Sequence, residues 1–180
     1  MNIGYITGLI VGGLLLISVI TLTNRMNENS GQVSLYHTAR VQHNTSVKWM
    51  TDELRKIGYR VDANAAPIVE ADSTSITFHY RRYDEPDPVQ VRWHLGEQQD
   101  GAGYTLIRTE NGDDAVINQN VKIAGFTYLD EYEQKLEEPI NPQDIRRIKI
   151  LLETEPAEQW GRNSISTRYE SSIVPHNLNL

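Results

Sequence analysis

The sequence predicts an α+β protein in which a long N-terminal helix packs on an antiparallel β-sheet. Three observations lead to this prediction: an uncharged apolar run at the N-terminus, a helical period of apolar residues after it, and several segments in which apolar and polar residues alternate. At 180 residues the chain fits one domain with an appendage. We expect a transmembrane helix at 1–23, an amphipathic continuation of this helix at 24–60, and the sheet domain at 61–180.

The segment from Ile3 to Leu22 contains no charged residue, and the first charged side chain is Arg25. Twelve of these twenty residues are Leu, Ile or Val. A helix of this length, at ~1.5 Å per residue, spans about 30 Å, the thickness of a hydrocarbon core. A cleaved secretory signal has a basic stretch before its apolar region and an Ala-x-Ala-like site after it, whereas here no Lys or Arg precedes the run and the first alanine is Ala39. The sequence therefore predicts a retained single-pass membrane helix.

Three glycines recur at four-residue intervals within this segment, namely Gly4, Gly8 and Gly12. Small residues at this spacing form a groove on a membrane helix into which a second helix backbone fits closely. The alternative is that glycine is simply frequent in membrane helices. We expect the glycines to form a helix-packing face.

Residues 24–60 are expected to continue the helix, with a possible kink or melted turn in the polar stretch Asn24–Gly31. An apolar stripe at helical spacing is predicted to pack on the sheet. It starts with Val33, Tyr36 and Arg40 and continues with Val47, Met50, Leu54 and Ile57. Gly58 is the expected stop, because glycine accepts the left-handed conformation that ends many helices.

The rest of the chain reads as strands with one buried face, because apolar and polar residues alternate in it. Strands are expected over Ser75–Tyr83, Val89–Leu95, Tyr104–Thr109, Val121–Leu129, 148–152 and 165–173. Two prolines place a turn at Asp84–Pro88, and a slip in the alternation around Gly125 suggests a bulge there. Together these segments predict an antiparallel sheet of about five to seven strands on the apolar stripe of the helix.

The composition excludes several classes of chemistry. The chain has no cysteine, which removes disulfides, thiolate metal sites and a cysteine nucleophile, and its net charge of −7 argues against nucleic-acid binding. No catalytic motif is present, so we expect no enzyme, no cofactor and no metal. Weaker alternatives are a metal held by His79 and His94 across a hairpin, calcium at the acidic loops 84–87 or 110–114, and stacking of single-stranded DNA on 81–83 and 92–94.

Several stretches in succession carry a family resemblance. The predicted helix ends in a D-x-x-R-x-x-G-Y pattern at Asp52–Tyr59. Further matching stretches are Ser75–Phe78, Tyr104–Arg108, Val121–Leu129, Ile145–Ile150 and Ser171–Leu178. In this order, after an uncharged N-terminal span, they resemble minor pilins and pseudopilins of the PilW, GspJ and ComGF kind over nearly the whole chain.

The resemblance implies a structural subunit of a type IV pilus-like or type II secretion filament, which acts by assembly and contact. Its implied partners are other pilin or pseudopilin subunits, an inner-membrane assembly platform and the lipid bilayer, and its sheet domain is extracytoplasmic, in a cell-surface or periplasmic filament. If the family's cut falls after Gly4, its glutamate position holds Leu9, so we do not expect peptidase processing. A tip subunit, a lineage with another assembly rule and a membrane protein outside any filament remain open. The rival function is a non-polymerising single-span envelope protein with a ligand-binding β domain.

Overall fold

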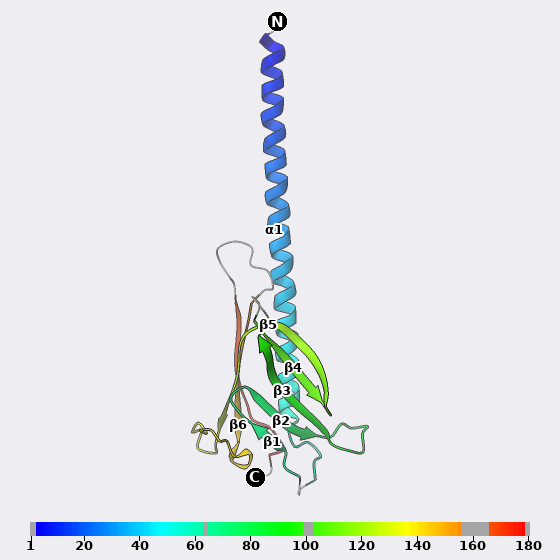
Figure 1. Ribbon diagram of the computed structural model, residues 1–180, viewed down its shortest axis with the longest axis vertical. Helices are drawn as coiled ribbons and strands as arrows, with labels where there is room; N and C mark the ends of the chain where they lie inside the picture. The colour runs from blue at the N-terminus through cyan, green and yellow to red at the C-terminus, as the bar shows by residue number, and fades with distance from the viewer. Residues whose placement is uncertain (1–2, 63–64, 99–102, 156–165, 179–180) are drawn as a thin grey trace. The chain divides into compact units, whose positions relative to one another are not determined.

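A computed structural model describes residues 3–62, 65–98, 103–155 and 166–178 of the chain. The chain divides into two compact units, Met1–Thr38 and Ala39–Leu180, which are described separately. Helix α1 (Ile3–Arg55) supplies all the regular structure of the first unit and the first element of the second (Figure 1).

The first unit is helical at every described residue. A melted turn is therefore absent from Asn24–Gly31, and that expectation is wrong. Four hydroxyl side chains in or next to the apolar segment donate hydrogen bonds to the carbonyl oxygen four residues earlier, at 2.8–2.9 Å; they belong to Thr7, Ser18, Thr21 and Thr23. These bonds satisfy polar groups that lipid cannot, which makes the hydroxyls compatible with an apolar environment.

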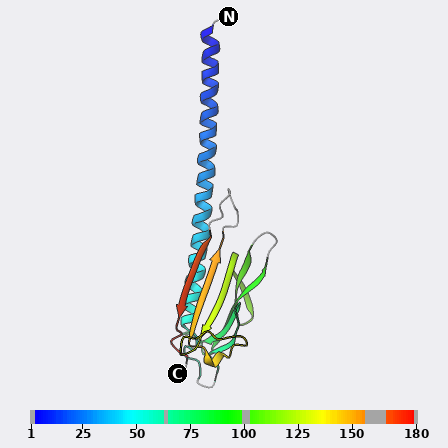
Figure 2. The same cartoon turned by 90° about the vertical axis from the view of Figure 1, so that its left-hand side faces the viewer.

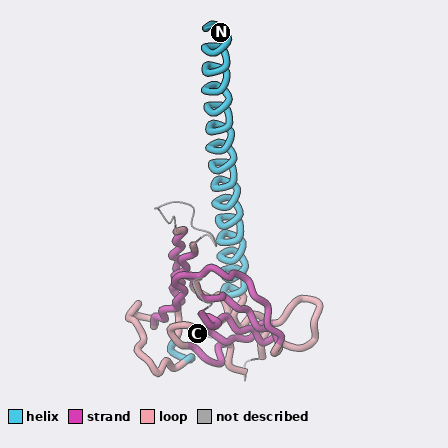
Figure 3. The backbone as a smooth tube through the Cα atoms, turned by 45° about the horizontal axis from the view of Figure 1, so that its top comes forward, coloured by secondary structure: helices cyan, strands magenta, loops and turns pink. Residues whose placement is uncertain are grey.

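The second unit contains a sheet of seven antiparallel strands in which each strand pairs with its neighbours in the sequence. The strands are β1 (Ile68–Ala71), β2 (Ser75–Tyr80), β3 (Val89–Gln98), β4 (Tyr104–Glu110), β5 (Asp113–Leu129), β6 (Arg147–Thr154) and β7 (Thr167–Ile173). A short 3-10 helix, η1 (Pro142–Asp144), precedes β6. Figure 3 colours the strands of this sheet magenta, and Figure 2 shows β6 and β7 side by side.

The core lies between the sheet and the last part of α1, so the predicted α+β arrangement of a long helix on an antiparallel sheet is confirmed. Large side chains from both layers are fully buried there, among them Trp93, Phe78 and Tyr128 from the sheet and Met50 and Leu54 from the helix. Because burial of apolar area is the main favourable term in folding, this contact holds the helix to the sheet.

Two turns follow from local chemistry. Gly58 has a φ of +74°, so the left-handed conformation predicted after the helix is present. Asn111 and Gly112 have φ values of +50° and +97° and join β4 to β5. Positive φ at both central residues is typical of a type I′ hairpin turn.

The strand predictions need three corrections. Strand β1 was not expected, and β5 begins at Asp113, directly after the Asn111–Gly112 turn, so it is much longer than predicted. The bulge lies between Val121 and Ile123, whereas Gly125 pairs in register with Leu151. The extra residue, Lys122, changes the phase of the strand, and the glycine is therefore not its cause.

Candidate functional site

The first candidate site is the apolar surface of α1 in the first unit. Its large side chains from Ile3 to Leu22 are between 41% and 80% exposed, and the described chain contains one helix long and apolar enough to cross a membrane. Monomeric soluble proteins rarely leave so large an apolar surface in water. The surface therefore requires lipid or other apolar helices around it.

The predicted glycine face lies on this surface. Gly4, Gly8 and Gly12 are all exposed, and a Cβ atom added at Gly8 or Gly12 would meet nothing within 4 Å. No described part of the chain fills the groove at these two positions. Helix packing at the glycines stays a prediction, because its partner would be a second chain.

The second candidate site is the docked face of α1, where the helix contacts the sheet. The structure places the four predicted packing residues in the core, with exposed fractions of 9% for Val47, 1% for Met50 and 0% for Leu54 and Ile57. The start of the stripe differs from expectation, because Val33 is 67% exposed and the buried face begins at His43.

A buried carboxylate, Glu53, lies on the docked face, and sequence reasoning missed it. Its side chain is 4% exposed and accepts hydrogen bonds from the Arg108 guanidinium at 2.7 and 3.0 Å, from Trp93 Nε1 at 2.9 Å and from the Tyr80 hydroxyl at 3.3 Å. These donors come from β4, β3 and β2. The signal in the sequence is helical phase, since Glu53 follows the buried Met50 by three residues.

An alternating chain of charges extends from this carboxylate to the surface. Arg108 also donates to Glu110, and Glu110 accepts from Arg82 at 2.7 Å, which in turn pairs with Glu85 at 3.0 Å. Burial raises the pKa of the Glu110 carboxyl, but the hydrogen bonds from Arg108 and Arg82 outweigh burial and lower it overall. Burial opposes the charge of Arg108, yet its bonds to Glu53 and Glu110 raise its pKa overall. Glu110 and Arg108 therefore both stay charged near neutral pH.

A polar cluster occupies the beginning of the docked face. It consists of His43 and Ser46 on α1, Asn118 on β5 and Thr154 on β6, and each is at least 94% buried. His43 Nδ1 lies 2.9 Å from Thr154 Oγ1, and Asn118 Nδ2 donates to Ser46 Oγ at 3.5 Å. Burial lowers the pKa of the His43 imidazole. Neutral imidazole is therefore the favoured form at this place.

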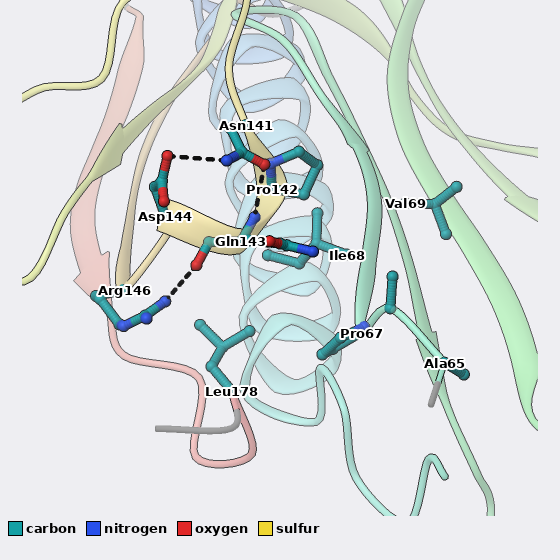
Figure 4. Close-up of a pocket in the computed structure, with 11 residues that line it drawn as sticks. Ala65, Pro67, Ile68, Val69, Asn141, Pro142, Gln143, Asp144, Arg146 and Leu178 are labelled. Carbon is teal, nitrogen blue, oxygen red and sulfur yellow. Dashed lines mark hydrogen bonds between the residues drawn. The ribbon is translucent and has the colours of Figure 1, made fainter. Parts of the chain in front are cut away.

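A cavity of about 670 Å³ lies between the start of β1 and the η1 segment (Figure 4). Its lining includes Ile68 and Leu178 on the apolar side and Asn141, Asp144 and Arg146 on the polar side. Arg146 Nη1 donates to the Gln143 carbonyl at 2.7 Å. Among the described residues that line this cavity there is no Ser, Thr, Cys or His, and its charged side chains are those of Asp144 and Arg146.

The weaker sequence candidates are not supported by the geometry. His79 is opposite Gln90 and His94 is opposite Ser75, so the two histidines do not face each other, and that prediction is wrong. In the part of the chain that the structure describes, no three His, Asp or Glu side chains gather as a metal site. Trp93 is fully buried, so its ring is not available for stacking with a base.

Comparison with known proteins identifies no relative, so a function must be argued from the fold and from these sites. No protein-family model matches the chain, and no curated protein matches it. The fold defines an α+β protein with one helix suited to crossing a membrane.

Proposed function

We propose that this protein is a minor pilin or pseudopilin, a non-enzymatic structural subunit of a type IV pilus-like or type II secretion filament. It is stored in the membrane through residues 3–22, with the sheet domain on the extracytoplasmic side. It assembles through α1 with other subunits, on an inner-membrane platform, into a cell-surface or periplasmic filament.

One observation supports the proposal most directly. A single uninterrupted helix, Ile3–Arg55, joins an exposed apolar segment to a segment that is buried against a sheet. A flexible linker would be enough to tether a domain to a membrane. Such a linker would also keep the conformational entropy that residues lose when they are fixed in a helix. A helix that is apolar in its first part and packs on a sheet in its last part is suited to a subunit whose helix takes part in a filament core.

The buried ion pair between Glu53 and Arg108 agrees with this role. Rows of subunits in a filament repeat only if each domain has a fixed rotation about its helix. The Glu53 carboxylate meets donors from three strands, so turning the helix would leave the Arg108 guanidinium buried without this partner. That loss makes one rotation strongly preferred.

The experiment is to shear surface filaments from the native cells and to quantify this protein by mass spectrometry in the sheared and membrane fractions. Enrichment in the sheared fraction, together with other pilin-like subunits, is the expected result. Its abundance relative to those subunits then distinguishes a shaft subunit from a tip subunit. Shearing does not release a short filament that lies inside the envelope. Cross-linking of this protein to other subunits in intact cells would detect such a filament.

Recovery of all the protein in the membrane fraction, with no cross-links to other subunits, would overturn the proposal. The alternative would then lead, namely a non-polymerising envelope protein with a ligand-binding β domain. The cavity beside η1 is the observation that favours this second function, since its volume of about 670 Å³ lies in the range of small-molecule sites.

A further inference from the structure

The contact between α1 and the sheet has two chemically different parts. From Met50 to Ile57 the buried side chains are apolar, apart from Thr51 and the fully paired Glu53. From His43 to Ser46 the buried side chains are polar. His43 precedes Glu53 by ten residues, about 15 Å along the helix, so the polar cluster and the ion pair lie at opposite ends of the docked face.

His43 is the titratable member of the polar cluster. The residue is 2% exposed, and its Nδ1 atom lies 2.9 Å from the hydroxyl of Thr154. Thr154 is the last residue of β6 and is itself buried. A neutral imidazole and a hydroxyl satisfy each other, because either one can donate and the other accept.

The charged groups on the surrounding elements are engaged elsewhere or face solvent. Lys122 of β5 pairs with Glu155 at 2.8 Å and Glu153 at 3.5 Å, and Arg168 of β7 pairs with Glu170. On α1 itself, Arg40 and Lys48 are exposed. Among the described residues no carboxylate forms an ion pair with His43, and burial is the cause that lowers its pKa.

Protonation would therefore place at this end of the docked face a cation that no carboxylate among the described residues pairs with. The imidazolium has two N–H donors and no acceptor lone pair, and a buried charge without a partner is strongly disfavoured. The least costly response is local, because the Met50–Ile57 part keeps its apolar contacts and its ion pair. The turns around His43 can separate from β5 and β6 and hydrate the ring.

We propose that His43 is an acid-sensitive latch: protonation of its ring releases the turns of α1 around His43 from β5 and β6, while the part from Met50 to Ile57 stays docked. At neutral pH the docked helix is held from His43 to Ile57, and in acid the held part shortens. The proposal concerns the second unit alone and does not depend on filament assembly.

The sign of the pH dependence follows from the lowered pKa. An unburied histidine titrates near pH 6.5, so above that pH the ring is neutral in both the docked and the released state. Below it the released state takes up a proton that the docked state does not. The latch therefore weakens as the pH falls through about 6.5, by at most about tenfold per pH unit for one proton, until the lowered pKa of the docked ring is reached.

The test is amide hydrogen exchange of the full chain in detergent micelles at about pH 7.5 and about pH 5.5, corrected for the intrinsic exchange rate at each pH. In the wild type, protection of the amides at 43–48 should fall by about tenfold in acid, whereas that of 54–57 should not change. In H43Q, whose amide can still bond the Thr154 hydroxyl, the acid-dependent loss should disappear.

Two controls isolate His43. H37Q removes an exposed histidine from the same helix, and H94Q removes a sheet histidine whose pKa is also lowered, by burial and by Arg92. Both variants should keep the wild-type response at 43–48. An NMR titration of the His43 ring in the wild type needs no variant and should give a pKa below 6.5.

Four results would overturn the proposal. The first three are an unchanged protection at 43–48 in acid, a loss that persists in H43Q, and a His43 ring that titrates at or above the ordinary value. The fourth is a loss of protection along the whole docked segment, from 43 through 57, since it would indicate global unfolding.

Discussion

Glu53 shows how one buried charge fixes a helix on a sheet. Its carboxylate accepts from Tyr80, Trp93 and Arg108, which lie on three different strands. A shift of the helix by one residue turns its side chains by about 100° and would move the carboxylate away from all three donors. Apolar contacts tolerate some rotation, whereas this set of hydrogen bonds does not. We infer that Glu53 selects the orientation of α1 in the second unit.

Replacement of Glu53 by glutamine should lower the free energy of unfolding by about 3 kcal/mol. The side chain keeps its size, but the Arg108 guanidinium, 6% exposed, loses the buried one of its two carboxylate partners and keeps only Glu110. Urea unfolding of the full chain in detergent micelles, followed by Trp fluorescence, measures the change.

The matched control is E170Q, which makes the same chemical change in an exposed pair. Glu170 and Arg168 are 64% and 58% exposed. Such pairs contribute little, so E170Q should change the free energy of unfolding by less than about 0.5 kcal/mol. A loss below about 1 kcal/mol in E53Q would mean that Glu110 compensates Arg108 by itself, and the assigned role of Glu53 would be wrong.

The apolar residues of the docked face were predictable, and its polar residues were not. Val47, Met50 and Leu54 stand out because apolar side chains at helical spacing need a buried face. Glu53 and His43 share that face, but a charged or titratable side chain on a helix normally points to solvent. Only the positions of Arg108 and Thr154, distant in the sequence, make their burial possible.

At the scale of elements, the end of α1 depends on the backbone of Gly58. Its φ is +74°, and an added Cβ would lie 2.5 Å from the Asn177 carbonyl oxygen. We expect G58A to lower the free energy of unfolding by about 3 kcal/mol, through backbone strain and this clash together. Thermal unfolding of the full chain measures the effect.

G112A separates the two causes. Gly112 also has a positive φ, +97°, but an added Cβ there meets nothing within 4 Å. The variant should lose about 1 kcal/mol, through strain alone. Equal losses in the two variants would show that the approach of Asn177 to Gly58 contributes nothing.

The strands divide in the same way between predictable and unpredictable features. The alternation of apolar and polar residues in the sequence located β2, β3, β4, β6 and β7. Strand β1 has only four residues, Ile68–Ala71, too few for a period to show, and its place is set by pairing with β2. The bulge at Lys122 depends on how β5 pairs with β6. The sequence of one strand does not contain this register.

At the scale of the whole molecule, the glycine face gives a test in which the monomer does not change. A side chain added at Gly8 meets nothing within 4 Å, and the same holds for Gly13. Gly13 lies about 140° around the helix from Gly8, away from the glycine face. We expect G8L to reduce the filament fraction of the protein about tenfold, because the larger side chain keeps a neighbouring helix away.

G13L should leave that fraction unchanged, and both variants should unfold like the wild type. Quantification of sheared filaments by mass spectrometry, with total protein as the reference, measures both. If G8L enters filaments as well as G13L does, the glycines are not a packing face.

The sequence alone predicted the helix and the sheet, since the contacts between them lie within one chain. The use of the exposed helix stays a proposal, because that contact is made with another chain.

The order of the strands in the sheet has a consequence for how the chain folds. Because every strand pairs with the next one in the sequence, most sheet contacts close over short loops. Such contacts form quickly, since little chain entropy is lost before each one is made. The hairpins can therefore close one after another as the polypeptide is synthesised. The docked part of α1 precedes all of them in the chain, so it can pack on the sheet only after the strands that hold Glu53 have formed.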